Sequence, residues 1–146
     1  HDLLAQLAKQ FPKSFSLKIA YDNKLAHLIE AGADMFLMPS RYEPCGLNQL
    51  YSLKYGTVPV VRGVGGLEDT ITDYTAQPDT GTGFKFHDYS KEALLDAVER
   101  ALSLYRNKKA WAALVKRCMT EDFSWERSAK EYVGLYKKAI AKHESR

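Results

Sequence analysis

The residues best suited to chemistry lie in two short bends. The first bend, residues 43–46, has the sequence Glu-Pro-Cys-Gly and carries one carboxylate, Glu43. The second bend, residues 63–66, has the sequence Gly-Val-Gly-Gly. Each bend follows an apolar run and precedes a segment with a helical pattern. Because a hydrophobic core needs neither feature, both bends are candidate ligand-binding sites.

The second bend has the features of a phosphate-binding turn. Glycines let a backbone approach a ligand closely, and the amide N–H groups at the start of a helix favour an anion. A tight turn that only uses the flexibility of glycine is the alternative. The spacing differs from the dinucleotide-binding G-x-G-x-x-G pattern, because Leu67 and Glu68 follow Gly66. The glycines alone leave both interpretations open.

Glu43 could accept hydrogen bonds from the hydroxyl groups of a sugar. The backbone N–H groups of Gly46 and Leu47 would then be available to the same ligand. The alternative is a surface carboxylate that stabilises the start of the following helix by ~0.3–1 kcal/mol. Spacing alone does not decide between these two roles.

The elements that would position the bends alternate along the chain. Short apolar or alternating runs predict four strands, at residues 15–20, 35–38, 58–61 and 84–86. The run at residues 35–38 is fully apolar, which is typical of a strand buried on both faces. With helical patterns between the runs, this order predicts an α/β fold: a Rossmann-like open parallel sheet with C-terminal helices. Ligands bind beyond the carboxyl ends of such strands, where both bends lie.

The last third of the chain is helical and ends in an apolar stripe. We call this stripe the C-terminal seam; it consists of Trp125, Ala129, Tyr132, Val133, Tyr136 and Ile140, at helical spacing. One possibility is that the seam packs within the chain, on the helix around Trp111 and Leu114. The other is that the seam stays exposed or is covered by a neighbouring chain.

The composition excludes several other classes of protein. The 146 residues are 45% hydrophobic and 27% charged, which predicts one domain with a real core. No apolar run reaches the ~20 residues of a membrane span, so we expect no membrane partner. The net charge of +3 is small and spread along the chain, so we expect no nucleic-acid partner either. Cys45 and Cys118 lie far apart without metal-binding spacing, which predicts reduced thiols, no metal and no cofactor.

Several runs together resemble one family. They are the runs at residues 39–47 (PSRYEPCGL), 54–57 (KYGT), 65–70 (GGLEDT) and 122–125 (DFSW). At this separation they resemble the glycogen synthases of bacteria and the starch synthases of plants, over nearly the whole chain. The resemblance implies a retaining hexosyltransferase with two Rossmann-like domains, which moves glucose from ADP-glucose to the non-reducing end of an α-1,4-glucan. Residues 1–146 would form a single, partial C-terminal domain that binds the nucleotide sugar.

The resemblance also implies roles for individual residues. Glu43 would contact the donor glucose at the catalytic centre. The hydroxyl groups of that glucose would be held by the backbone N–H groups of Cys45, Gly46 and Leu47. The diphosphate would be bound by the backbone N–H groups of Val64, Gly65, Gly66 and Leu67. Tyr21 would pack against the adenine, whereas its sequence position alone favours an aromatic that closes a strand.

The family further implies groups that this chain does not carry. Members have an Arg and a Lys for the diphosphate in a leading strand region, and before it an N-terminal domain that binds the α-glucan acceptor. In members the final helix crosses back to that domain, so the resemblance implies that the C-terminal seam bridges to it. Without that domain, some of Tyr132, Tyr136 and Ile140 would be under-buried or covered by a neighbouring chain. We therefore expect the chain to be a truncated C-terminal domain that binds ADP or ADP-glucose weakly and is inactive alone. The absence of a starting Met agrees with a fragment or with a processed product.

Tyr51 helps to choose among related transferases. A wider set of sugar transferases carries a second Glu eight residues after the first, and here that position is Tyr51. This favours the glycogen and starch synthase branch. A transferase that uses another nucleotide sugar, and a nucleotide-binding module without activity of its own, stay open as alternatives. The sequence around Tyr42 and Tyr51 resembles bacterial members, so we expect a cytoplasmic protein rather than a plastid one.

Overall fold

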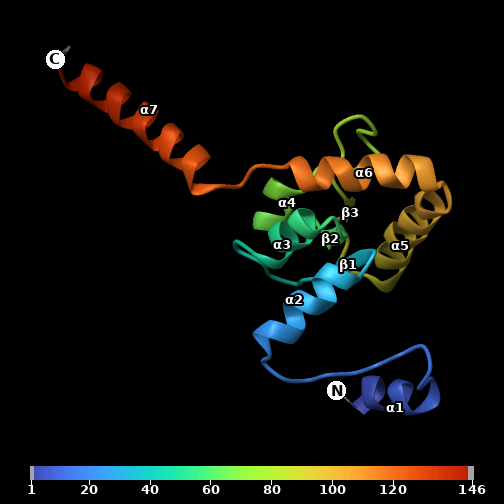
Figure 1. Ribbon diagram of the computed structural model, residues 1–146. Helices are drawn as coiled ribbons and strands as arrows, with labels where there is room; N and C mark the ends of the chain where they lie inside the picture. Colours follow the sequence, from blue (N-terminus) through green and yellow to red (C-terminus); the bar gives the residue numbers. More distant parts are fainter. Residues whose placement is uncertain (1, 145–146) are drawn as a thin grey trace.

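The computed structural model describes residues 2–144 as a small α/β body with a helix standing apart at its C-terminal end (Figure 1). The elements in chain order are α1 (Asp2–Gln10), α2 (Asn23–Gly32), β1 (Met35–Met38), α3 (Asn48–Tyr55), β2 (Val58–Arg62), α4 (Gly66–Thr70), β3 (Phe84–Phe86), α5 (Lys91–Arg106), α6 (Lys108–Thr120) and α7 (Trp125–Glu144). Among these described residues, no helix combines the length and apolar character needed to cross a bilayer.

The sheet consists of parallel strands in the order β1-β2-β3. Leu37 pairs with Val60 on one side of the central strand, and Val60 pairs with Phe84 on the other. Parallel strands have their carboxyl ends at one edge of the sheet. The first bend follows β1 and the second bend follows β2, so both lie at that edge. The predicted open parallel sheet is confirmed.

The prediction of a strand at residues 15–20 is wrong. The described part of the chain has three strands, and this segment is not one of them. Ile19 is 58% exposed, and Phe15 and Leu17 are only half-buried. A strand is stabilised by pairing with a neighbour and by packing one face against other side chains. This segment has neither form of support, so its alternating pattern is not enough.

The position of β1 corrects a second expectation. Within residues 2–144, β1 pairs with β2 alone and is therefore an edge strand. Leu37 is 49% exposed, whereas Met38 is buried. The apolar run at residues 35–38 is thus not buried on both faces, unlike β2, in which Val58 through Val61 are all buried.

Several helices complete the core by packing against β2, namely α3, α4, α5 and α6. Ala97 and Ala101 are fully buried on α5, where their small side chains allow a close approach to the sheet. On α6, burial raises the pKa of the Cys118 thiol to about 12, and Cys118 Sγ donates to the carbonyl oxygen of Thr82 at 3.1 Å. Cys118 is therefore a protonated core residue.

Helix α7 extends away from the rest of the molecule (Figure 1), and none of its residues is buried. Along the C-terminal seam, Trp125 is 84% exposed and Tyr136 is 61% exposed. Trp111 and Leu114 are buried without any contribution from α7. The expected exposure of the seam is confirmed, and the alternative of packing on α6 is wrong. A bridge to a further domain stays a prediction.

We expect the exposed seam to cause concentration-dependent self-association, because burying one large apolar side chain contributes ~1.5–3 kcal/mol. The double change Tyr132→Ser and Tyr136→Ser should shift the chain toward monomer in sedimentation velocity. Lys138→Ser, on the opposite face of α7, should leave the distribution unchanged. A chain with an intact seam that stays monomeric at every concentration would contradict this expectation.

Candidate functional site

The two bends contact each other through their backbones. The N–H of Gly66 donates to the carbonyl oxygen of Glu43 at 3.1 Å. A Cβ atom added to Gly66 would lie 1.7 Å from the carbonyl oxygen of Cys45, and one added to Gly65 would lie 2.1 Å from that of Glu43. Gly65 also has a φ of +52°, in the region that favours glycine. Glycine is therefore required at both positions by the contact itself.

Some of the amides that were predicted to bind a diphosphate are used inside the protein, and the others are free. The N–H of Gly66 is used in the contact, and that of Leu67 donates to the carbonyl oxygen of Val64 at 3.2 Å. The N–H groups of Val64 and Gly65 have no hydrogen-bond partner within residues 2–144. Two of the four predicted amides are thus free for a ligand, and their role stays a prediction.

Glu43 lies in the first bend as an oriented, half-buried carboxylate. Its Oε2 accepts a hydrogen bond from Ser40 Oγ at 3.1 Å, and no cation pairs with it among the described residues. The backbone N–H groups of Cys45, Gly46 and Leu47 also lack a partner in that part of the chain, where α3 begins. A carboxylate beside a row of free donors suits the hydroxyl groups of a sugar.

Gln49 connects the two bends, although no motif in the sequence indicates this role. Its Nε2 lies 3.2 Å from the carbonyl oxygen of Cys45, 3.1 Å from that of Gly46 and 3.3 Å from Thr70 Oγ1. The hydroxyl of Thr70 donates in turn to the carbonyl oxygen of Gly66. Because Gln49 is fully buried, this link lies beneath the bends rather than on the ligand side.

Arg62, at the end of β2, joins the approach to the first bend to the segment after β3. Its Nε donates to the carbonyl oxygen of His87 at 2.8 Å, and its Nη1 donates to that of Arg41 at 3.2 Å. The guanidinium also lies 5.3 Å from the ring centre of Tyr89. Loops that follow all three strands are therefore held together at one edge of the sheet.

A second carboxylate, Glu68, lies beside the second bend in a different setting. Lys85 Nζ is 2.8 Å from Glu68 Oε1, and His87 Nδ1 is 3.8 Å from Glu68 Oε2. Glu68 is thus paired with cationic or protonatable neighbours, whereas Glu43 is not. This difference makes Glu68 a matched control for tests of Glu43.

The two tyrosines named from the sequence have different surroundings. Tyr21 is 98% exposed and therefore packs against neither bend. Since residues 15–20 form no strand, the alternative that Tyr21 closes a strand is wrong, and its contact with adenine stays a prediction. Tyr51 lies on α3 with its ring centre 5.0 Å from that of His27 on α2. Tyr51 thus contributes to the contact between α3 and α2.

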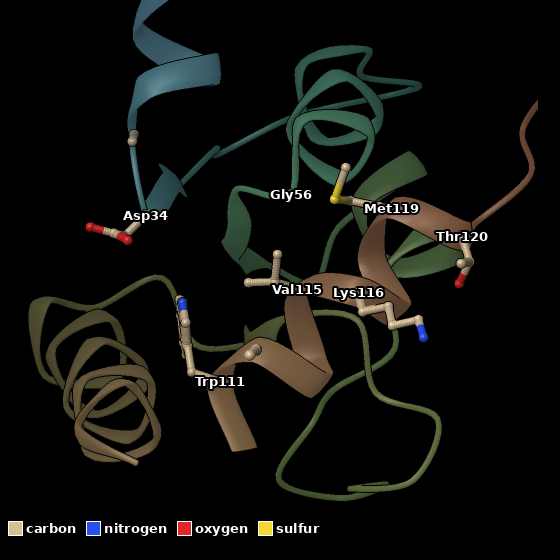
Figure 2. Close-up of a pocket in the computed structure, with 9 residues that line it drawn as sticks. Asp34, Gly56, Trp111, Val115, Lys116, Met119 and Thr120 are labelled. Atoms are coloured by element: carbon tan, nitrogen blue, oxygen red, sulfur yellow. The ribbon is translucent and has the colours of Figure 1, made fainter. Parts of the chain in front are cut away.

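A groove of about 610 Å³ lies at the other end of the sheet (Figure 2). Asp34 precedes β1 and Gly56 precedes β2, so the groove is at the amino ends of the strands, away from the bends. Its wall is mainly apolar, with Trp111 on one side, and the Asp34 carboxylate accepts a hydrogen bond from the Tyr105 hydroxyl at 3.1 Å. The groove offers no chemistry comparable to that of the bends.

A parallel sheet with crossover helices and a glycine bend at its carboxyl edge defines a Rossmann-like α/β domain. The family described as "Glycosyl transferases group 1" matches residues 6–117. The chain belongs to this family.

Relatives within this family are glycogen synthases. The chain is 59% identical over 138 residues to glycogen synthase of Koribacter versatilis, a match that covers 94% of this chain and 28% of the relative. It is 53% identical over 142 residues to glycogen synthase of Thermosipho melanesiensis, covering 97% of this chain and 30% of the relative. The chain thus spans less than a third of the length of these relatives.

Solved structures agree with this assignment. The catalytic domain of starch synthase IV from Arabidopsis thaliana, bound to ADP and acarbose, is 34% identical with a TM-score of 0.81; the match covers 96% of this chain and 30% of that one. Sucrose-phosphate synthase from Thermosynechococcus elongatus is 22% identical with a TM-score of 0.64, covering 97% of this chain and 34% of that one, and shows the fold alone. The resemblance predicted from the sequence runs is confirmed.

We expect Gly66→Ala to destabilise the chain by about 1–3 kcal/mol, because the added methyl group overlaps the carbonyl oxygen of Cys45 and forces the first bend outward. Urea unfolding measures this loss. Gly32→Ala is the control, since a Cβ there meets nothing within 4 Å. Equal midpoints for the two variants would mean that the contact between the bends is not tight.

Proposed function

We propose that this chain is the donor-binding part of a glycosyltransferase of the glycogen and starch synthase type. The transferase moves glucose from ADP-glucose to the non-reducing end of an α-1,4-glucan, with retention at the anomeric carbon. The observation that carries the proposal is the interlocked pair of bends. It brings an unpaired carboxylate, Glu43, together with two sets of free backbone N–H groups at one sheet edge. The names of the relatives, and the ADP and acarbose in the starch synthase structure, support it.

In this proposal the second bend stabilises the leaving group. The bond between the glucose C1 and the diphosphate oxygen breaks, and negative charge builds on the diphosphate. The N–H groups of Val64 and Gly65 are free and already oriented, so they stabilise this charge without reorganising. Because they are uncharged donors, they give weaker binding than an Arg or Lys would. We expect those cationic groups to lie outside this chain.

The first bend acts on the sugar. Free N–H groups from Cys45 to Leu47 hold the glucose hydroxyl groups, and Glu43 stabilises the positive charge that develops on the ring. The acceptor hydroxyl of the glucan attacks C1 from the face that the diphosphate leaves, which preserves the configuration. Its oxygen forms the new bond to C1, and its proton passes to the departing diphosphate.

The adenine and the acceptor complete the proposed complex. Tyr21, which is 98% exposed, offers an open aromatic face on which an adenine can stack. Since the chain covers 28% of the Koribacter versatilis relative, we place the α-glucan site in a further, N-terminal domain. The chain by itself would then bind nucleotide without turnover. We propose a cytoplasmic location for the whole enzyme.

The test uses a chimera in which this chain replaces the matching 138 residues of Koribacter versatilis glycogen synthase. Glu43→Gln keeps the shape of the side chain and removes its charge, so turnover of ADP-glucose should fall about 100-fold or more, while ADP affinity changes little. Glucosyl transfer to glycogen and calorimetry with ADP measure the two effects.

Glu68→Gln is the matched control, because Glu68 is ion-paired and lies beside the second bend. It should retain most of the turnover. A Glu43→Gln chimera that is as active as this control would refute the catalytic role of Glu43. A chimera with the unaltered chain that transfers glucose from another nucleotide sugar, but not from ADP-glucose, would refute the proposed donor.

A further inference from the structure

We infer that Gln49 is a positioning residue, whose side-chain amide fixes the first bend, and with it Glu43, relative to the second bend. The inference rests on the proposed function, because it assigns part of the geometry of that reaction to a residue that no ligand touches. Gln49 is fully buried on α3, directly beneath the residues that would hold the sugar.

The orientation of the Gln49 amide follows from its neighbours. Its –NH₂ group lies against the carbonyl oxygens of Cys45 and Gly46, which can only accept hydrogen bonds, so Nε2 and not Oε1 must face them. Oε1 is buried and has no hydrogen-bond partner among the described residues. A Cβ added to Gly46 would lie 2.6 Å from Oε1, and Gly46 has a φ of +72°. The amide therefore fills the space under a turn that requires glycine.

The hydrogen bonds around Gln49 form a closed ring that includes both bends. From Nε2 the ring passes to Thr70 Oγ1 at 3.3 Å, and from the Thr70 hydroxyl to the carbonyl oxygen of Gly66. The N–H of Gly66 then donates to the carbonyl oxygen of Glu43, which returns the ring to the first bend. Hydrogen bonds connected in this way within a buried region reinforce one another. A shift of either bend must break at least one member.

Because Oε1 is buried without a partner, a substitution of Gln49 can distinguish a positioning role from a purely structural one. An apolar side chain of similar length leaves the carbonyl oxygens of Cys45 and Gly46 without their donor, but it also removes the unpartnered acceptor, which offsets part of that cost and limits the loss of stability. The position of Glu43 should change more, because a displacement of about 1 Å at a reacting group can cost about 100-fold in rate. Gln49→Met should therefore impair function more than folding.

Ser52→Ala is the matched control for Gln49→Met. Ser52 is fully buried on the same face of α3, and its Oγ also lacks a hydrogen-bond partner within residues 2–144. The first measurement is amide hydrogen exchange on the chain itself. Gln49→Met should speed exchange of the Gly66 amide by about tenfold or more, since its bond to Glu43 loses support, while the Val60 amide in β2 is unaffected. Ser52→Ala should change neither.

The second measurement is steady-state kinetics in the Koribacter versatilis chimera. Gln49→Met should lower kcat by about 10- to 100-fold and leave KM for ADP-glucose within about threefold, the split expected when geometry and not ground-state binding is lost. Gln49→Glu adds a pH test. The buried carboxyl faces two carbonyl oxygens, so its pKa is raised, and only its protonated form can donate to them. The activity of Gln49→Glu relative to the unaltered chimera should therefore rise as the pH falls from 7 toward 5.

Two results would overturn the inference. One is that Gln49→Met matches Ser52→Ala in both Gly66 exchange and kcat. The other is that exchange quickens throughout the chain and kcat falls only in step with thermal stability, which is the pattern of a structural residue. A third result separates this inference from the proposed function: the unaltered chimera transfers no glucose, but Gln49→Met still speeds exchange of the Gly66 amide selectively. The role of Gln49 in the contact between the bends would then be supported, and the proposed function would be refuted.

Discussion

Gly65 and Gly66 lie so close to the carbonyl oxygens of Glu43 and Cys45 that neither glycine could carry a side chain. This backbone contact constrains the rest of the site. It uses the N–H of Gly66 internally and leaves those of Val64 and Gly65 free. It also fixes the distance between the carboxylate side of the site and the phosphate side. Gln49 and Thr70 act on the same contact from the interior.

The sheet supplies a rigid base for this contact. β2 is buried along most of its length and leads directly into the second bend, while β1, its paired neighbour, leads toward the first. Two bends anchored on paired strands move together, which suits a reaction in which charge develops on sugar and leaving group at once. The groove, by contrast, has a mainly apolar wall and lies at the amino ends of the strands, at the opposite end of the sheet.

Local patterns in the sequence predicted much of the fold. Asp22 and Ser90 are residue types that favour the start of a helix, and they cap α2 and α5 by accepting hydrogen bonds from the N–H groups of Leu25 and Ala93. The position of both bends followed from the order of strands and helices. The pattern at residues 15–20 gave a wrong prediction, because alternation of apolar and polar side chains is a local property, whereas a strand needs a neighbouring strand to pair with. The role of Gln49 was hidden for a related reason: a polar residue among buried positions of α3 was the available signal, and its partners are backbone atoms and Thr70, which leave no pattern in the sequence.

Titration of the ¹⁵N-labelled chain with ADP, followed by the amide NMR signals, shows whether the two bends form one nucleotide-sugar site. If they do, the signals of Val64, Gly65 and the Cys45 to Leu47 amides should shift along one saturation curve, and AMP, which lacks the second phosphate, should bind more weakly. Signals that stay unchanged at both bends at millimolar ADP, or shifts confined to the groove around Trp111, would contradict it.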